Sequence, residues 1–550
     1  MTAFGADPTG HTDSAPAVAA ALRHARTLHG PVRITFPTGT YQLYPEHAEI
    51  RELYVSNTVG ADQRYKDKRI GLLVEDMRDV TVDGRGSRLI FHGTQTAFAA
   101  IRSTGVTFTN FSFDYAAPKV IDATVVAAGP AWRILRIPEG SPYRVEGTHV
   151  VWLGGTSPAT GQPYWSGVDG LEYTQIHDPA AQRTWRGDNP LFAGVAAVTD
   201  LGDRHIRIDY TSATPPADAG LVYQMRLTER EHPGVFIADS GNVTLCALDA
   251  HFMQEFGVVA QNSADITIDG VNFAPDPASG RSTSSFADHV QMSGVSGRVT
   301  ITGNVFDGPH DDPINVHGTY LEVTGRAGPA TLTLAYMHPQ TAGFPQFSPG
   351  DEVQFVDKRT MTPLPGGPAV VTAVDDASLT TMTVAFDRPV SAGPAGTVAE
   401  NLTRTPEVLI AGNVFRNVPT RGVLVTTPRP VRITGNVFDG VSMAGVYISA
   451  DATQWYESGA VTDVTIRGNT FTRAAGPVIL IEPTNTVLDP ARPVHHNIAV
   501  EGNAFDAADA TIADVKSVQG FRFTGNTVLR RPGREAPFAF RGCTRVLIED

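Results

Sequence analysis

The sequence predicts an all-β protein, a parallel β-helix into which two small antiparallel β-barrels are inserted. A pattern of alternating apolar residues, then Gly-Asn, then an apolar side chain recurs along the chain. Equivalent Asn residues are regularly spaced: the interval from Asn413 to Asn436 is the same as the interval from Asn503 to Asn526. Two long stretches lack the pattern and contain strand-like runs separated by Pro and Gly. These observations divide the chain into a helix and first coils (1–113), a first insertion (114–230), further coils (231–318), a second insertion (319–405) and C-terminal coils (406–550).

The Gly-Asn step explains how each coil can turn. Both residue types tolerate the left-handed backbone that a sharp corner requires. We interpret the Asn residues as a hydrogen-bonded ladder and the following Phe as a stack inside the coils, and we assign none of these Asn residues to chemistry. The coils that end at Asn469 and Asn503 are longer than the regular interval. The extra residues in these coils predict long loops, which commonly build the binding face of a solenoid.

The N-terminal segment predicts an amphipathic helix between Ser14 and Gly30, with Asp13 or Ser14 as its N-cap. The apolar face of this helix contains Val18, Leu22, Ala25 and Leu28. The preceding FGADPTG resembles the start of pectin-lyase-like right-handed β-helix proteins. In those proteins the helix caps the first coil, whose strand edges would otherwise be exposed.

Composition excludes several classes of partner. The net charge is −14 and basic clusters are absent, so we expect no nucleic-acid or anionic-membrane partner. No apolar run approaches the length of a transmembrane helix, about 18 residues. The opening MTAFGADPTG lacks the features of a signal peptide. We expect a secreted or periplasmic protein whose signal segment is not part of this chain, with the cytoplasm as the alternative.

The chain is organised around an acidic stretch from Phe286 to Gly318. It contains Asp288, Asp311 and Asp312, with His residues at 289, 310 and 317. The interval from Asp288 to Asp311 equals the regular interval between the corner Asn residues, which is the length of one coil. We therefore expect these two residues to lie in register on neighbouring coils, about 4.8 Å apart along the solenoid. The second insertion begins directly after this stretch, so we expect it to wall the site.

Three neighbouring carboxylates cannot all ionise cheaply, so one should have a raised pKa. A proton donor beside one or two acceptors is the equipment for glycoside hydrolysis. The separation of the carboxyl groups decides between inversion and retention, and the residues alone leave both open. A solvated acidic corner and a calcium site are the alternatives for the cluster.

Two families of β-helix hydrolases resemble this stretch. Polygalacturonases carry one Asp, then an Asp pair about one coil later, then His-Gly, as in DHVQMSG (288–294) and GPHDDPINVHG (308–318). This chain lacks their downstream Arg-x-Lys and is acidic overall. The closer resemblance is to glycoside hydrolase family 110, the exo-acting α-1,3-galactosidases that remove the blood-group-B galactose. It rests on FGADPTG, RLTEREHPGVFI (226–237), GVVAQNSADITIDGVNF (257–273), HDDPINVHGT (310–319) and the two insertions.

The resemblance implies an inverting mechanism without cofactor or metal. In this assignment Asp311 is the general acid, and Asp288 and Asp312 position and deprotonate the attacking water. Arg230 closes the first insertion, and we interpret it as part of a structural latch. We expect substrate-binding roles for seven further residues, each with a local structural contact or a packing role as its alternative: His310, His317, Asn315, Gln291, Arg421, Trp455 and Glu482.

The leading interpretation is an exo-α-1,3-galactosidase acting on galactose-terminated oligosaccharides or glycoconjugates of the blood-group-B type. A polygalacturonase-like glycosidase, a calcium-dependent polysaccharide lyase and a noncatalytic carbohydrate-binding β-helix are the alternatives. A strand face of the solenoid could pair two copies into a homodimer, although no stripe of residues singles one out.

Overall fold

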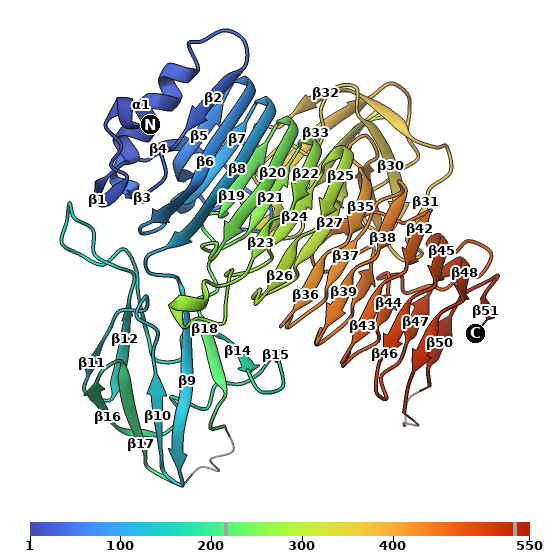
Figure 1. Cartoon of the computed structure of the whole chain (residues 1–550). Coiled ribbons are helices and arrows are strands. Elements are labelled where there is room, and N and C mark those ends of the chain that lie inside the picture. Colours follow the sequence, from blue (N-terminus) through green and yellow to red (C-terminus); the bar gives the residue numbers. More distant parts are fainter. Residues whose placement is uncertain (214–217, 532–535, 550) are drawn as a thin grey trace.

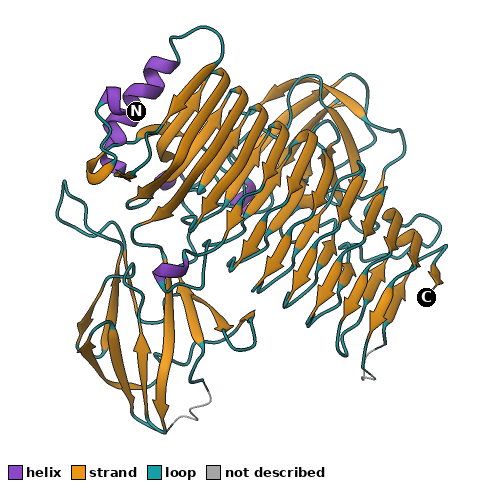
Figure 2. Cartoon of the chain, in the orientation of Figure 1, coloured by secondary structure: helices purple, strands orange, loops and turns teal. Residues whose placement is uncertain are grey.

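A computed structural model of the protein describes residues 1–213, 218–531 and 536–549. These residues form a parallel β-helix with two inserted antiparallel domains, as predicted (Figure 1). Figure 2 shows that strands dominate and that the one long helix lies at the N-terminal end of the solenoid. Among the described helices, none is long and apolar enough to span a membrane. The short 3-10 helices are η1 (Thr2–Phe4), η2 (Pro45–His47), η3 (Gln63–Tyr65), η4 (Pro277–Ser279) and η5 (Pro339–Thr341).

The helix α1 (Ala15–Ala25) caps the first coils with the apolar face that the sequence predicted. Ser14 is its N-cap residue, and the Asp13 side chain accepts a hydrogen bond from the backbone N–H of Ala15 at 2.9 Å. The helix is shorter than predicted. It ends at Ala25 because the next residues form tighter turns, so Leu28 lies outside it and is 49% exposed.

Each coil contributes two strands to a first sheet and one strand to a second sheet. The coil with β38 (Val431–Thr434), β39 (Val437–Asp439) and β40 (Val446–Ile448) is typical. Its corner is Gly435-Asn436, where Gly435 has φ +63°. Positive φ at this position is the conformation for which glycine is suited.

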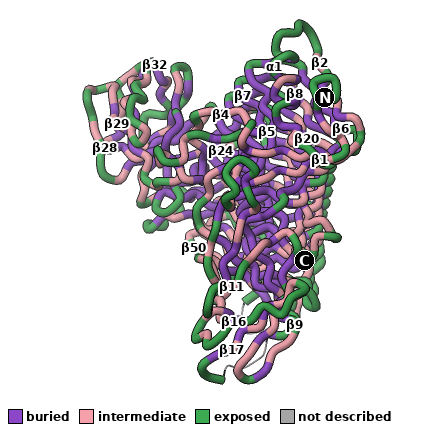
Figure 3. Tube along the Cα trace, turned by 90° about the vertical axis from the view of Figure 1, so that its left-hand side faces the viewer, coloured by how far each residue is buried: buried purple, intermediate pink, exposed green. Residues whose placement is uncertain are grey.

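The Asn ladder and the Phe stack are both confirmed. The side-chain amide of Asn413 donates to Asn436, and that of Asn436 donates to Asn469, each at 2.9 Å. Phe415 and Phe438 stack with ring centroids 4.5 Å apart. These buried amides pair with one another along the solenoid axis, so the coils that carry Asn304 to Asn526 are each tied to the next. Figure 3 shows the resulting buried interior.

The first sheet joins 21 strands within the described residues. Its strands are β1 (Thr9–Asp13), β2 (Val32–Thr35), β3 (Thr40–Leu43), β6 (Arg78–Phe91), β8 (Thr104–Tyr115), β20 (Gly241–Ala250), β22 (Ala264–Asp269), β23 (Asn272–Phe273), β25 (Ser296–Thr302), β26 (Val305–Asp307), β35 (Glu407–Ala411), β36 (Val414–Arg416), β38, β39, β42 (Val464–Arg467), β43 (Thr470–Thr472), β45 (His495–Glu501), β46 (Ala504–Asp506), β48 (Val518–Thr524), β49 (Thr527–Leu529) and β51 (Leu547–Glu549).

The second sheet carries the acidic stretch, and it joins 13 strands within the described residues. Its strands are β4 (Glu49–Glu52), β5 (Asp67–Glu75), β7 (Thr96–Ile101), β19 (Val235–Ala238), β21 (Val258–Gln261), β24 (Val290–Ser293), β27 (Ile314–Thr319), β37 (Val423–Val425), β40, β44 (Ile479–Ile481), β47 (Ala513–Lys516), β50 (Phe538–Arg541) and the antiparallel β41 (Glu457–Ser458).

The first insertion packs a seven-stranded antiparallel sheet and a three-stranded sheet around a core of its own. Among its described strand pairs, the order of the larger sheet runs from β15 to β16 without closing a ring. Its strands are β9 (Val120–Gly129), β10 (Trp132–Arg136), β11 (Tyr143–Glu146), β12 (His149–Leu153), β13 (Ser166–Val168), β14 (Tyr173–Asp178), β15 (Arg183–Arg186), β16 (Val195–Gly202), β17 (His205–Tyr210) and β18 (Val222–Arg226).

The second insertion is a closed antiparallel barrel, because its strand order returns from β34 to β30. Its strands are β28 (Leu321–Gly328), β29 (Thr331–Ala335), β30 (Glu352–Asp357), β31 (Thr362–Pro363), β32 (Ala369–Asp375), β33 (Thr381–Phe386) and β34 (Thr397–Asn401).

The register of the acidic stretch differs by one residue from the prediction. Strand β24 pairs with β27 so that Gln291 lies opposite Asn315, an offset one residue longer than the interval from Asp288 to Asp311. The backbone N–H of His289 accordingly donates to the carbonyl of Asp312. The coil is one residue longer here than the regular interval, so Asp312, and not Asp311, is the register partner of Asp288.

Candidate active site

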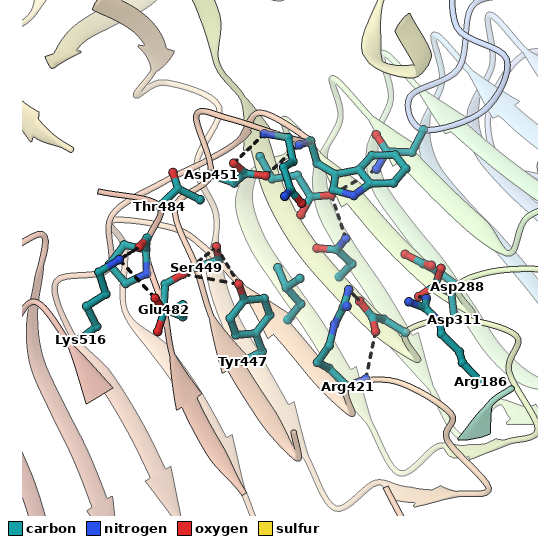
Figure 4. A pocket seen from close by; sticks show the side chains of 18 of the residues that line it. Arg186, Asp288, Asp311, Arg421, Tyr447, Ser449, Asp451, Glu482, Thr484 and Lys516 are labelled. Atoms are coloured by element: carbon teal, nitrogen blue, oxygen red, sulfur yellow. Dashed lines mark hydrogen bonds and ion pairs between the residues drawn. The ribbon is translucent and has the colours of Figure 1, made fainter. Parts of the chain in front are cut away.

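A cavity of about 380 Å³ lies along the second sheet, and the acidic stretch lines one end of it. Its volume is in the usual range for small-molecule sites, roughly 300–1,000 Å³. The lining follows successive coils through Asn315, Leu424, Tyr447, Glu482 and Lys516. Figure 4 shows Asp288 and Asp311 at one end and Lys516 at the other.

The three carboxylates come together at the turns that precede β24 and β27. Asp288 and Asp312 are 5% and 1% exposed. Asp312 accepts a 2.5 Å hydrogen bond from the Arg421 guanidinium and a 3.1 Å bond from the Arg421 backbone N–H. Asp311 is the more open of the acidic pair, and its side chain is 15% exposed. The arrangement places three acids with different partners around one point of the cavity.

Electrostatics separates the acids as the sequence predicted. Burial, and then the charges of Asp311 and Asp312, hold the pKa of Asp288 well above its ordinary value. Burial also raises the pKa of Asp312, and the Arg421 guanidinium opposes that shift. Of these two buried carboxyls, Asp288 is therefore the one whose pKa is raised further and which favours a proton more strongly.

The first insertion supplies a cation to this cluster. Arg186, at the end of β15, donates a 3.0 Å hydrogen bond from its guanidinium to Asp311. Arg230 approaches the other oxygen of Asp311 at 3.8 Å. The expectation that the second insertion walls the site is wrong: among the described residues that line the cavity, none comes from 319–405.

The second insertion instead packs behind one wall. His338 packs on Trp455 with ring centroids 4.2 Å apart and the rings tilted by 32°, and Trp455 lines the cavity. Lys358 donates to the hydroxyl of Tyr456 at 3.0 Å. A small apolar cluster joins barrel residues such as Val398 to this loop. The second insertion therefore supports the loop that carries Trp455.

Four of the seven expected substrate-binding residues line the cavity, and three do not. The four are Asn315, Arg421, Trp455 and Glu482. His310 is fully buried behind the acids, where it accepts a 3.0 Å hydrogen bond from Arg226. Burial and the nearby arginines lower the pKa of His310 well below its ordinary value, so the ring is neutral.

Gln291 and His317 also lie behind the lining. The amide of Gln291 donates to Ser56 at 3.4 Å. His317 contacts the carbonyl of Gly318 at 2.8 Å through Nδ1, and its Nε2 is 3.6 Å from Glu457. Both residues support the wall of the cavity.

Sequence reasoning missed several lining residues. They are Asn57, Arg186, Tyr447, Ser449, Asp451, Glu457 and Lys516, and Arg230, for which the sequence indicated only a structural latch. Glu457 could have been expected to line the cavity, because it lies two residues after Trp455 in the same long coil. Arg186 lies in an insertion without repeat pattern, so its approach to Asp311 had no sequence signal.

Three possible metal ligands meet outside this cavity, at Glu231, His232 and Glu255. The ammonium of Lys119 pairs with both carboxylates, at 3.5 Å from Glu231 and more closely with Glu255. Nε2 of His232 accepts a hydrogen bond from the backbone N–H of Arg69. Nδ1 of His232 makes no hydrogen bond and lies 3.7 Å from Glu255. Because Lys119 neutralises the carboxylates, the group fits a buried ion-pair cluster better than a metal centre.

Comparison with known proteins finds relatives along almost the whole chain. An alpha-1,3-galactosidase A of Streptomyces avermitilis is 70% identical, over 99% of this chain and 90% of its own length. The chain belongs to the alpha-1,3-galactosidase family. Another family member, the alpha-1,3-galactosidase A of Peterkaempfera griseoplana, is 53% identical, over 97% of this chain and 76% of its own length. That of Bacteroides thetaiotaomicron is 36% identical, over 89% and 84%.

A domain profile matches one part of the chain. The profile, described as GLAA-B beta-barrel domain II, covers residues 331–395. These residues lie in the second insertion, which forms the closed barrel. Together with the full-length relatives, this match confirms the resemblance to glycoside hydrolase family 110.

Proposed function

We propose that this protein is an inverting exo-α-1,3-galactosidase that hydrolyses terminal galactose from blood-group-B-type glycans. The observation that carries the proposal is the meeting of Asp288, Asp311 and Asp312 at one end of a cavity, in a chain of the alpha-1,3-galactosidase family. Two carboxyl groups can serve a glycosidic bond as acid and base, and a third can help to hold the water.

The proposed roles follow the family resemblance. Asp311 protonates the glycosidic oxygen, since it is the most open of the three acids. Asp288 and Asp312 orient and deprotonate water on the opposite face of the sugar ring. The negative charge that remains stabilises the oxocarbenium character of the transition state. Arg421 favours the anionic form of Asp312 through its 2.5 Å hydrogen bond.

One observation favours a second assignment, in which Asp288 is the general acid. Burial and two neighbouring carboxylates raise the pKa of Asp288, whereas the guanidinium of Arg186 contacts Asp311. A proton resident on Asp288 is available for transfer to a leaving group. This assignment keeps the reaction and exchanges the roles of the two acids.

Leaving-group dependence separates the two assignments. Loss of the general acid harms substrates with poor leaving groups far more than an activated aryl galactoside. Asp311→Asn and Asp288→Asn are assayed on an α-1,3-digalactoside and on 4-nitrophenyl α-galactoside, with and without azide. Preserved aryl activity in Asp311→Asn, with azide rescue in Asp288→Asn, supports the first assignment. The reverse pattern supports the second.

The reaction itself is tested by proton NMR of the released sugar. The substrates are blood-group-B trisaccharide, a linear α-1,3-digalactoside and polygalacturonate. β-Galactose appearing first, and no product from polygalacturonate, is the expected result. No galactose from either galactoside would overturn the proposal, and α-galactose appearing first would overturn inversion.

A further inference from the structure

Glu457 is a fourth acid in the cavity, and the proposed chemistry does not use it. It lies on β41, which pairs antiparallel with β27, the strand that follows Asp311 and Asp312. Its side chain is 9% exposed. A carboxylate so far removed from water is costly unless the protein or a ligand satisfies both of its oxygens.

One oxygen of Glu457 is held by the protein. Its Oε1 accepts hydrogen bonds from the side-chain amides of Asn57 and Asn315, each at 3.2 Å. Asn57 has φ +58° and is itself held by the hydroxyl of Ser56, which donates to the Asn57 side-chain oxygen at 3.1 Å. Two amides from different parts of the chain therefore fix the position of this carboxylate.

The other oxygen, Oε2, has no hydrogen-bond or ion-pair partner among the described residues. The two other wall carboxylates opposite the catalytic acids are satisfied. Asp451 accepts three backbone N–H bonds from residues 453–455, the longest at 3.0 Å. Glu482 pairs with Lys516 at 3.2 Å and with Arg541. Glu457 thus offers a fixed and unused acceptor to the cavity.

An aromatic surface lies next to this acceptor. Trp455 is two residues before Glu457, lines the same cavity and is 36% exposed. His338 packs on its indole from the second insertion. A sugar ring has hydroxyl donors at its edge and an apolar C–H face, and this corner offers a matching surface for each.

We propose that Glu457, held by Asn57 and Asn315, binds a hydroxyl of the terminal galactose while Trp455 packs on the apolar face of the sugar. This inference rests on the proposed galactosidase function and names residues that recognise its substrate. Glu457 acts in binding, and the proton transfers stay with the three aspartates.

Glu457→Gln tests the charge without changing the volume. Because the Gln oxygen remains on Asn57 and Asn315, its NH₂ group faces the cavity and the sugar hydroxyl loses its acceptor. We expect kcat/KM for an α-1,3-digalactoside to fall roughly 10- to 100-fold, the range for a hydrogen bond to a charged group. Glu501→Gln is the matched control, because Glu501 ends β45 on the first sheet. Wild-type activity in Glu457→Gln would overturn the inference.

Deoxy substrates identify the contact. Four digalactosides that lack the terminal O2, O3, O4 or O6 are compared in wild type and Glu457→Gln. The variant's penalty should vanish for one of the four analogues and persist for the other three. A penalty that persists for all four would overturn the assignment of Glu457 to a hydroxyl.

Two readouts separate binding from catalysis and from failure of the proposed function. Glu457→Gln should keep the shape of the wild-type pH profile and should not be rescued by azide, whereas rescue would make Glu457 a catalytic base and overturn the inference. Galactose binding by saturation-transfer NMR needs no turnover. Binding by wild type and weaker binding by a folded Glu457→Gln support the contact even if no galactoside is cleaved. Equal binding, or no binding by either protein, overturns it.

Discussion

The two insertions are both antiparallel β domains placed between coils of the same solenoid, yet they meet the cavity differently. The first sends Arg186 to within 3.0 Å of Asp311. The second sends no described side chain into the lining, but packs His338 against Trp455. One insertion acts on the charge of the acidic cluster, and the other supports a wall.

The difference shows that position in the sequence is a poor guide to what an insertion does. The second insertion follows the acidic stretch directly, whereas Arg186 is 125 residues before Asp311. In a solenoid, residues far apart in sequence become neighbours when a domain folds back over the coils. Four variants, described from the largest expected effect to the smallest, test this division of labour.

Asp311→Asn should have the largest effect, a loss of about 10³- to 10⁶-fold in kcat with little change in Tm. If Arg186 acts through Asp311, adding Arg186→Met to Asp311→Asn should cause no further loss. Steady-state kinetics of the single and double variants measure the coupling. If Arg186→Met lowers kcat as much in Asp311→Asn as it does in the wild type, Arg186 acts independently of Asp311.

Arg186→Met alone should lower kcat/KM about tenfold, since the pair is partly exposed and an exposed pair is worth little. Arg136→Met is its control, because Arg136 is an exposed residue of β10 in the same insertion. Equal kinetics for the two variants would remove the electrostatic role of the first insertion.

His338→Ala should raise KM about two- to tenfold and leave kcat unchanged, because only the support of Trp455 is lost. The neighbouring Met337 is 44% exposed, so Met337→Ala controls for a change at the barrel surface. A fall in kcat with constant KM would contradict the supporting role.

Glu400→Gln should change stability without changing activity. Burial in the second insertion raises the pKa of Glu400 from 4.5 to about 8. Because the folded pKa is the higher one, the contribution of protonated Glu400 to the stability of the wild type is fully present below pH 4.5 and is lost as pH rises toward 8. The loss is about 1.4 kcal/mol per pH unit.

Thermal unfolding at pH 5, 6.5 and 8 checks this prediction. The Tm of Glu400→Gln should exceed that of wild type by an amount that grows with pH, whereas Glu352→Gln, an exposed site on β30, should follow wild type. A constant difference between Glu400→Gln and wild type across this range would refute the ionisation argument.

Much of the fold could be predicted from the sequence because each coil repeats the same local signals for its strands and its corner. Each Gly-Asn pair predicts a corner of the coil from the local sequence alone. Asn413, Asn436 and Phe438 were therefore placed correctly without knowledge of the other coils. The register at Asp288 failed by one residue, since the turn before β27 is longer than a regular corner. A period cannot predict such a local extension.

The candidate site was predictable only where one segment carries several of its residues. The acidic stretch provides Asp288, Asp311 and Asp312 together, and their unusual density was visible. Asn57, Arg186 and Glu457 come from three other regions and meet only after folding. Gln291 and His317 show the opposite error. Both were predicted to bind substrate because they are polar and close to the acids in sequence, but they support the wall of the cavity from behind.

The Asn ladder implies an order in which the coils unfold. Stability in a solenoid resides largely in contacts between adjacent coils, so fraying should advance from an end. The cavity crosses several coils, from the acids at β27 to Lys516 at β47. Damage that enters from the C-terminal end would erode the Glu482–Lys516 side first and reach the acids last. Such a protein would lose glycan binding at the Glu482–Lys516 end of the cavity before it lost hydrolysis at the aspartates.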